Sequence, residues 1–399
     1  MITTINNKHK KLNFSSEREQ SQACLNSAEH EKNQGRKVLN VPNLRFKEFQ
    51  GEWEKCKLLK ICTFFSGGTP SSSNKDFYGG NIPFIRSGEL HADSTELFIT
   101  QAGFDSSSAK MVEIGDLLLA MYGATSGDIA VSKIKGAINQ AILCIRTKQN
   151  KKFIESVWNK HVSKNLRKYL QGGQGNLSAD IIKGISFSFP TLKEQEKIAN
   201  LVSLLDERIA TQNKIIDKLQ SLIKGIAQKI VHSNKTNVRL SECVECSSST
   251  LQESDVCEHG AYPVYGANGI VGNLDNYNTE GEAVYIIKDG SGVGTVSYVT
   301  GKCSATGTLN TLQAKEGYSL QYLYYLLKVF NFEPYKTGMA IPHIYFKDYG
   351  KAKFFCPSYT EQLQYAQSLS AIDSKLLVEK NILTSLSMQK KYLLRQMFI

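Results

Sequence analysis

The chain has 399 residues, of which 41 % are hydrophobic and 21 % are charged, a composition typical of globular proteins. This length predicts two or three domains. Its 48 lysines and arginines exceed its 37 aspartates and glutamates, and the net charge of +11 points to a polyanionic partner. The apolar runs are too short for a membrane-spanning helix, and residues 1–14 do not resemble a secretory signal, so we expect a cytoplasmic protein without membrane contact.

The positive charge is distributed unevenly along the chain. Residues 51–190 hold 17 basic and 12 acidic side chains, whereas residues 233–357 hold 10 basic and 12 acidic ones. The net charges of +5 and −2 predict that attraction to phosphate is stronger in the first half of the chain.

Residues 1–40 are polar and lack periodic hydrophobic residues, which predicts a disordered tail. From 41 to 189 the sequence changes to short β-like runs, such as 82–85 and 117–122, separated by Gly, Pro and Ser clusters. A helical pattern over 151–170 interrupts these runs. The segment 41–189 is therefore predicted to be a mixed α/β domain.

A long helix is predicted next, over 191–231 within a spacer segment 190–233. Its apolar residues recur at alternating steps of four and three from Ile198 to Ile230, which favours a coiled coil. Pro190 precedes the helix, Thr191 is a candidate N-cap, and Glu194 has the spacing of a capping box.

The same order then repeats. Residues 234–356 again show short β-like runs and one helical pattern, 320–329, and a second long helix is predicted over 357–399. A constant shift of 167 residues places Pro190 on Pro357, Glu194-Gln195 on Glu361-Gln362 and Leu219 on Leu386. One shift that holds over forty residues indicates an internal repeat.

This alternation of variable domain and long helix resembles the specificity subunits of type I restriction–modification systems, over residues 42–399. The duplicated Pro-x-x-x-Glu-Gln motif at 190–195 and 357–362 carries most of the resemblance. Residues 67–71 and 79–86 (GGTPS and GGNIPFIR), 262–269 (YPVYGANG) and 390–398 (KKYLLRQMF) also fit family usage. The resemblance implies an α+β fold in which two mixed α/β target-recognition domains alternate with two long helices that pair as an antiparallel coiled coil.

The resemblance also implies a function. Each domain would read one half of a bipartite, asymmetric site on double-stranded DNA, and the helices would dock two modification subunits that methylate adenine at N6, together with restriction/translocase subunits. S-adenosylmethionine, ATP and Mg are expected on those partners, with no cofactor bound by this chain. The alternatives are a coiled-coil scaffold that binds only proteins, and a zinc enzyme.

Sequence signatures of catalysis are missing. All eight prolines are isolated and none is followed by Asp, which excludes the Pro-Pro-aromatic motif of amino-methyltransferases and the usual Pro-Asp nuclease core. No phosphate loop of the Gly-x-x-x-x-Gly-Lys-Ser/Thr type is present. The glycines of 290–294 are interpreted as a tight turn, because no helix pattern follows them. A non-catalytic subunit is therefore predicted.

Candidate DNA contacts combine basic side chains beside glycine turns, one strongly basic helix face and two polar loops. A solvated charged face is the alternative interpretation of the helix, and a plain connector that of the glycine-rich loops. Tyr122 is assigned to the core. The candidates are Lys75, Arg86, Lys160, Lys164, Arg167, Lys168, Gln171, Gln174, Asn176, Lys336 and His343.

The heptads also predict a helix seam. Gln212 is its polar position in the first helix, and the shift of 167 maps it onto Glu379, so we expect this pair to meet where the helices face each other. The alternative is that both residues point to solvent at a loose crossing of the helices. Leu201, Leu204, Ile215 and Leu222 lie off the seam and would face a partner subunit, or pack on the neighbouring domain. The interface residues are Leu204, Leu205, Ile209, Gln212, Ile216, Leu219, Leu222, Ile372, Leu376, Glu379, Leu383 and Leu386.

Nine cysteines without an export signal predict reduced thiols. Cys243 and Cys246 have zinc-ligand spacing, and Cys257 with His259 would complete four ligands. The single residue between Cys257 and His259 argues against zinc, and no bound metal is expected.

Overall fold

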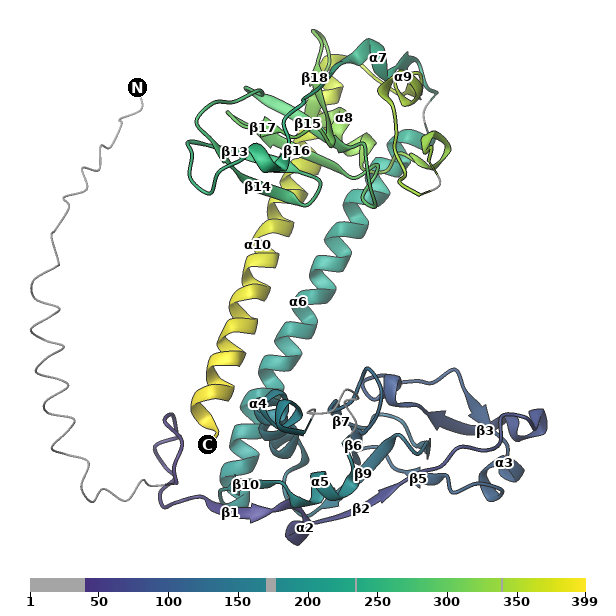
Figure 1. Ribbon diagram of the computed structural model, residues 1–399, viewed down its shortest axis with the longest axis vertical. Coiled ribbons are helices and arrows are strands. Elements are labelled where there is room, and N and C mark those ends of the chain that lie inside the picture. The colour runs from purple at the N-terminus through teal and green to yellow at the C-terminus, as the bar shows by residue number, and fades with distance from the viewer. Residues whose placement is uncertain (1–39, 170–176, 234, 339) are drawn as a thin grey trace, which may run out of the picture. The chain divides into compact units, whose positions relative to one another are not determined.

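The computed structural model describes residues 40–169, 177–233, 235–338 and 340–399, so most of the predicted tail lies outside the described residues. The chain forms two compact units: unit 1 extends to Leu204 and includes Lys390–Ile399, and unit 2 is Leu205–Gln389. The two long helices predicted from the heptads are present as α6 (Leu192–Ser233) and α10 (Tyr359–Met397), and each contributes to both units (Figure 1).

Unit 1 is a mixed α/β structure, as predicted. Its longest helix besides the spacers is α4, Lys151–Tyr169, which matches the helical pattern over 151–170. The other elements are β1 (Glu54–Lys57), α2 (Leu58–Ile61), β2 (Cys62–Ser66), β3 (Tyr78–Ile85), β4 (Phe98–Ile99), α3 (Gln101–Asp105), β5 (Lys110–Val112), β6 (Leu117–Ala120), β7 (Ile129–Val131), β8 (Gly136–Ile138), β9 (Ile142–Thr147), α5 (Ala179–Gly184) and β10 (Ser186–Phe189), with short 3-10 turns at Lys75–Phe77 and Ser87–Glu89.

Two four-stranded sheets and a two-stranded sheet, β1 with β10, build unit 1. The four-stranded sheets differ in strand direction. The first is antiparallel with the order β2-β9-β6-β7, and the second has the order β4-β3-β8-β5, in which β3 and β8 run parallel. All four residues of β6 are buried, which explains its continuous apolar sequence. Helix α4 buries Phe153, Ile154, Val157 and Trp158 in the same hydrophobic cluster as Leu117 and Leu119.

Unit 2 carries the second set of elements. Its domain helix is α8 (Leu320–Leu327), within the pattern predicted over 320–329. The other elements are β11 (Val238–Arg239), α7 (Leu240–Cys243), β12 (Val244–Ser248), β13 (Tyr262–Gly266), β14 (Gly269–Leu274), β15 (Glu282–Ile287), β16 (Val296–Thr300), β17 (Ser304–Ala305), β18 (Leu309–Ala314), α9 (Phe346–Tyr349) and β19 (Lys353–Phe354), with 3-10 turns at Glu253–Asp255 and Glu333–Tyr335.

The main sheet of unit 2 repeats the topology of unit 1. Its order, β12-β18-β15-β16, matches β2-β9-β6-β7 strand for strand. The smaller sheet, β14-β13-β17, again contains a parallel pair, β13 with β17. The internal repeat inferred from the helices therefore extends into both domains.

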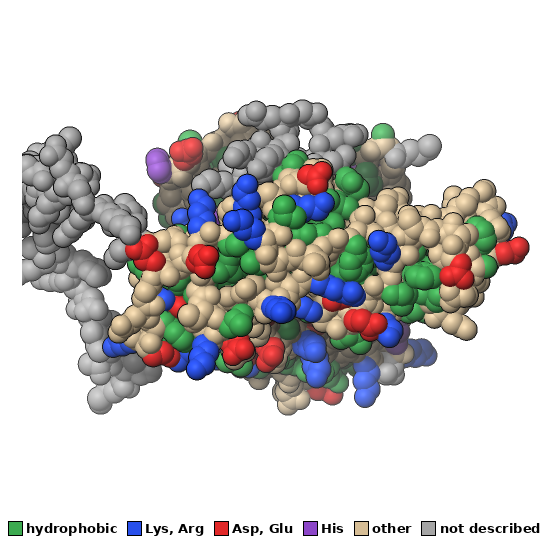
Figure 2. Space-filling view, turned by 90° about the horizontal axis from the view of Figure 1, so that it is seen from below, with side chains coloured by type: hydrophobic (Ala, Val, Ile, Leu, Met, Phe, Trp, Pro, Cys, Tyr) green, Lys and Arg blue, Asp and Glu red, His purple; other side chains and the backbone are tan. Residues whose placement is uncertain are grey.

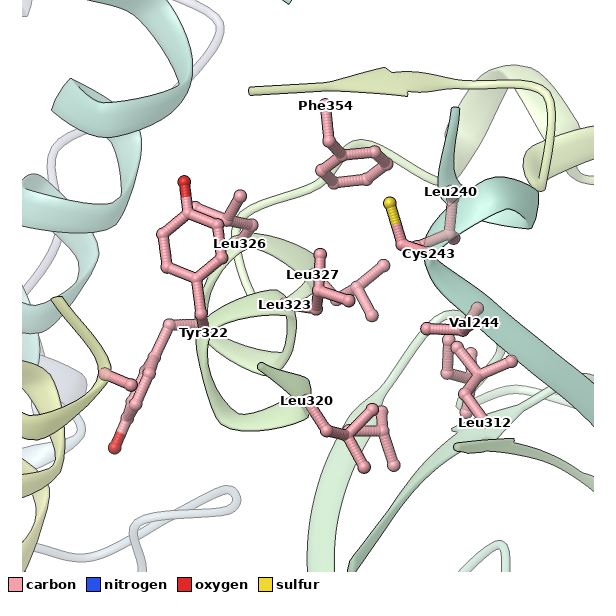
Figure 3. Packing of buried hydrophobic residues seen from close by; sticks show 14 of the residues in the cluster. Leu240, Cys243, Val244, Leu312, Leu320, Tyr322, Leu323, Leu326, Leu327 and Phe354 are labelled. Atoms are coloured by element: carbon pink, nitrogen blue, oxygen red, sulfur yellow. The ribbon is translucent and has the colours of Figure 1, made fainter. Parts of the chain in front are cut away.

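The core of unit 2 lies between α8 and the main sheet. Figure 3 shows Leu323 and Leu327 of α8 pointing toward Leu240 and Val244, with Phe354 above them. All five side chains are at most 3 % exposed. Burial of a Leu-sized side chain stabilises the fold by roughly 1.5–3 kcal/mol, so this cluster anchors α8 to the sheet.

A turn between two strands of the main sheet is present in both units. Gly123 and Gly127 follow β6, Gly290 and Gly294 follow β15, and all four have φ between 79° and 94°, where a side chain would be strained. The Gly127 amide donates to the Ala120 carbonyl and the Gly294 amide to the Ile287 carbonyl, both at 2.9 Å. The glycines of 290–294 thus form a tight turn, as interpreted from the sequence.

Helices α6 and α10 run antiparallel where they share a unit. In unit 2, Gln212 contacts Glu379, and Ile223 and Ile230 share a buried cluster with Leu369 and Ala366. Residue numbers that rise along α6 therefore fall along α10. The predicted fold, two mixed α/β domains with antiparallel long helices, is confirmed.

Candidate functional site

The start of each long helix is tied to its domain by a glutamine. Gln195 Nε2 donates to the Pro190 carbonyl at 2.9 Å, and its Oε1 accepts from the Asn150 amide at 3.1 Å. Gln362 does the same with the Pro357 carbonyl and the Ser319 amide, both at 2.9 Å. The side chains of Asn150 and Ser319 in turn accept hydrogen bonds from main-chain amides in the first turns of α4 and α8. The Glu-Gln motif thus fixes two helix starts at once.

The glutamates of the two motifs differ. Glu194 is 1 % exposed, and its carboxylate accepts from Arg45 at 2.7 and 2.8 Å and from Trp53 Nε1 at 3.3 Å. The capping box predicted for Thr191 and Glu194 is therefore wrong, because a guanidinium is the stronger donor for a buried carboxylate. Glu361 does accept from the Ser358 amide and hydroxyl at 3.2 and 2.6 Å.

The predicted seam pair is in contact. Gln212 Nε2 donates to the Glu379 main-chain carbonyl at 3.0 Å and also to its carboxylate. Lys375, one turn earlier on α10, pairs with the same carboxylate at 2.5 Å. Hydrogen bonds from Lys375 and then Gln212 lower the pKa of Glu379, because both favour the charged form.

The other predicted seam residues follow the heptad pattern. Ile216, Leu376 and Leu386 are buried, and the half-buried seam residues are Leu205, Ile209, Leu219, Ile372 and Leu383. Off the seam, Leu204, Ile215 and Leu222 are 59 %, 37 % and 48 % exposed. Leu201 is different, since it packs against the hydrophobic cluster of unit 1. These exposures leave an apolar stripe on α6 without cover from the described residues.

The candidate DNA contacts fall into several environments. Lys75 is exposed next to a turn. Arg86 is half exposed and pairs with Glu89 at 2.8 Å, and Lys336 pairs with Glu333. The backbone of His343 is bonded to Thr337, and its ring packs on Tyr345 at 5.1 Å between centroids.

Lys160 has a structural partner instead of an open position. Its ammonium donates to the main-chain carbonyls of Phe398 and Arg395, the latter at 3.4 Å, near the end of α10. Burial lowers the pKa of Lys160. A cation at a helix C-terminus neutralises the free carbonyls there, so this lysine secures the helix end.

The remaining candidates of the first domain have side chains outside the described residues. Lys164, Arg167 and Lys168 lie on the helical backbone of α4, but their side chains are outside the described residues, as are Gln171, Gln174 and Asn176.

Tyr122, assigned to the core from its apolar neighbours, is 39 % exposed at the turn after β6, so that assignment is wrong. Because β6 ends at Ala120, Tyr122 lies in the turn and not in the sheet, so the apolar run before it does not predict its burial.

One feature of unit 2 was missed from the sequence. Lys288, Asp289, Tyr345 and Lys347 line a hollow of about 430 Å³ with Cys246, Ser248, Asn310, Ile344 and Phe346. The shift of 167 already aligns Lys288 with Met121 and Asn310 with Leu143. This exchange of apolar for polar residues was the signal that could have revealed it.

Basic side chains are not gathered into one patch on the face seen in Figure 2, where they are scattered among acidic and apolar ones.

Among the described residues, no three His, Cys, Asp or Glu side chains are placed to hold a metal ion. Cys243 lies 3.8 Å from Cys356, between sulfur atoms, and Cys257 is exposed. Within the same residues, no helix is both long and apolar enough to span a membrane.

The comparisons with known proteins identify the family. The model for the type I restriction modification DNA specificity domain matches residues 50–221 and again 232–388, one match for each half of the repeat. The chain belongs to this family.

Individual members are distantly related to this chain. It is 27 % identical over 182 residues to the type I restriction enzyme MjaIX specificity subunit of Methanocaldococcus jannaschii, covering 42 % of each protein, so the match spans less than half of that relative. It is 21 % identical to the EcoprrI specificity subunit of Escherichia coli, covering 81 % of this chain and 88 % of that one. The specificity-domain fold is also that of the S subunit structure from M. genitalium, with a TM-score of 0.65 and 18 % identity, covering 90 % of this chain and 99 % of that one.

Proposed function

We propose that this chain reads a bipartite, asymmetric site on double-stranded DNA within a type I restriction–modification complex. The observation that carries the proposal is the repeated unit: two domains with the same main-sheet order, each joined by an equivalent glutamine to a long helix. A protein with two related readers is suited to a target of two half-sites.

The two half-sites are proposed to differ in sequence. Equivalent loop positions carry different chemistry, since Tyr122 in unit 1 corresponds to Asp289 in unit 2, and Met121 to Lys288. Side chains at such positions determine which base edges and phosphates a domain contacts. The target is therefore expected to be asymmetric.

The exposed stripe on α6 is the proposed docking surface for the modification subunits. Helix α10 also exposes apolar side chains, of which Leu377, Ile382 and Met388 are 62 %, 41 % and 63 % exposed. Contiguous exposed apolar side chains on long helices are typical of protein interfaces. We assign adenine-N6 methylation and its S-adenosylmethionine to the modification subunits, and ATP and Mg to any restriction subunit that joins the complex. A cytoplasmic location stays a prediction.

The test is co-expression of the chain with its modification subunits, followed by purification and mapping of methylated adenines. The wild-type complex should co-purify, bind duplex DNA with a steep salt dependence, and methylate a split motif. Leu204→Glu with Leu222→Glu should release the modification subunits while the isolated chain keeps its melting temperature. Ile114→Glu is the matched control, since Ile114 is 69 % exposed and lies between β5 and β6 of unit 1 instead of on a long helix.

Co-purification without salt-dependent DNA binding would instead support the protein-binding scaffold. Retention of the modification subunits by the Leu204/Leu222 variant would show that they dock elsewhere.

A further inference from the structure

Unit 2 contains a polar hollow at the end of its main sheet. It lies where β12, β15 and β18 come together, because Ser248 pairs with Asn310 and Asn310 with Ile286 in the strand register. The segment 344–347 closes one side, and the Ile344 amide donates to the Lys288 carbonyl at 2.9 Å. A volume of about 430 Å³ is within the range of ligand sites, roughly 300–1,000 Å³.

The same position in unit 1 is packed with apolar side chains. The Leu177 amide donates to the Met121 carbonyl at 2.9 Å, the equivalent of the Ile344–Lys288 bond. Met121 and Leu143, which correspond to Lys288 and Asn310, are 3 % and 1 % exposed in the core. The fold can therefore close this position with hydrophobic side chains, and folding alone does not account for a lysine there.

The charges of the hollow favour an anion. Lys288 is half-buried, and no ion pair reaches it or Lys347 from the residues that the structure describes. Asp289 is the acidic residue of the lining, which leaves a net charge of +1. The Lys347 ammonium lies 5.1 Å from the centroid of the Tyr345 ring, and that ring is 47 % exposed.

Hydrogen-bonding groups and an aromatic surface complete the lining. Asn310 is 4 % exposed and is held by Ser248, which donates to its Oδ1 at 2.9 Å, and by Tyr349, which accepts from its Nδ2 at 2.8 Å. This fixed polar floor with lysines at the rim suits a phosphate of duplex DNA and its sugar, because cations bind phosphate oxygens and protein side chains also contact the sugar.

We propose that this hollow holds a phosphodiester of the second DNA half-site, with Lys288 and Lys347 pairing with its oxygens and Tyr345 packing on the adjoining sugar. The proposal rests on the proposed DNA-reading function. It gives unit 2 a local phosphate site even though residues 233–357 carry a net charge of −2.

The test uses the full chain in complex with its modification subunits and a duplex containing the methylation motif mapped for the wild type. Lys288→Met introduces the unit 1 residue, and Lys347→Gln alters an exposed side chain that the fold does not need. Each should weaken DNA binding about tenfold and flatten the salt slope by about one unit. Lys353→Ala, which changes an exposed lysine on β19, is the control and should bind as the wild type does.

A stability measurement keeps the result interpretable. Lys288→Met keeps the buried Asn310–Tyr349 hydrogen bond, so it should retain the cooperative melting transition of the wild type and still lose affinity. Affinities and slopes equal to those of Lys353→Ala would overturn the proposal. So would a Lys288→Met variant that loses only the binding of inorganic phosphate, since the hollow would then be an anion site unrelated to DNA.

Different results would overturn the DNA-reading function and the phosphate site. A wild-type complex that binds no duplex would overturn the proposed function together with this inference. A wild-type complex that binds, with variants that bind equally well, would overturn the inference alone.

Discussion

Gln212 and Glu379 are 167 residues apart and form a buried contact, in which the glutamine amide donates to the glutamate carboxylate and to its main-chain carbonyl. Each is the equivalent of the other in the repeat, so two equivalent polar residues face each other in an otherwise apolar seam. A buried polar pair of this kind fixes the alignment of two helices at a cost in stability.

Replacing both residues with leucine should therefore raise the melting temperature and relax the helix alignment. In the assembled complex, the spacing between the two methylated adenines should become less strict, which methylation mapping would reveal. Gln212→Leu alone should destabilise the protein, because the carboxylate would keep only Lys375. A double variant with a lower melting temperature and unchanged spacing would contradict this role.

The same pair predicts a dependence on pH. The pKa of Glu379 is lowered by Lys375 and Gln212 from an ordinary value of 4.5. Its contribution to stability is therefore complete above pH 4.5 and is lost as the pH falls through the lowered value. Denaturant unfolding between pH 7 and pH 3 should show a smaller loss for the double leucine variant than for the wild type, and equal losses would argue against the assigned charge state.

Gln362 should be important for stability although it contacts no ligand. Gln362→Ala leaves the buried Ser319 amide and the Pro357 carbonyl without their partner, at a cost of about 2 kcal/mol. Gln364→Ala changes an exposed glutamine two residues later. As at most surface sites, this change should lower the free energy of unfolding by at most about 0.5 kcal/mol. Urea unfolding measures both, and equal effects would show that the Gln362 contacts are unimportant.

Lys160 should behave differently from its neighbours on α4. Lys160→Met removes the donor to the end of α10 and should lower stability by about 1 kcal/mol, without a change in the salt dependence of DNA binding. Neutralising Lys164, Arg167 and Lys168 should instead flatten the salt slope by about one unit for each lost phosphate contact. If the triple variant binds as the wild type does, that face of the helix is solvated.

Cysteine alkylation should separate three thiols by their surroundings. Burial raises the pKa of Cys144 to about 12 and that of Cys246 to about 11, whereas Cys257 is exposed. Because the thiolate is the reactive form, iodoacetamide at pH 8 should label Cys257 first and Cys144 last in the native protein. Peptide mass spectrometry follows each site, and urea should remove the difference; equal native rates would contradict the burial.

The sequence predicted most of the fold because its strongest patterns are local. Heptads and the Pro-x-x-x-Glu-Gln motif located α6 and α10, and the Gln212–Glu379 contact followed from the repeat shift. The capping box at Glu194 was wrong for a tertiary reason, because nothing near Glu194 indicates that Arg45, 149 residues earlier, binds its carboxylate. The contact of Lys160 with the end of α10 was likewise not indicated by its neighbours in the sequence. To predict the hollow at Lys288, the strand registers of the two units have to be compared. Helix periodicity gives no information about strand register.

The last ten residues of the sequence have a consequence for how the protein is made. Met397 and Phe398 are buried in the cluster of unit 1, where the Phe398 ring lies 5.3 Å from that of Phe153. At about 5–20 residues per second, a ribosome needs on the order of 10–40 s to proceed from Leu204 to these residues. During that interval the first domain has been synthesised but its core is incomplete, so unit 2, whose residues are contiguous, is the unit that can finish folding without waiting for a distant segment.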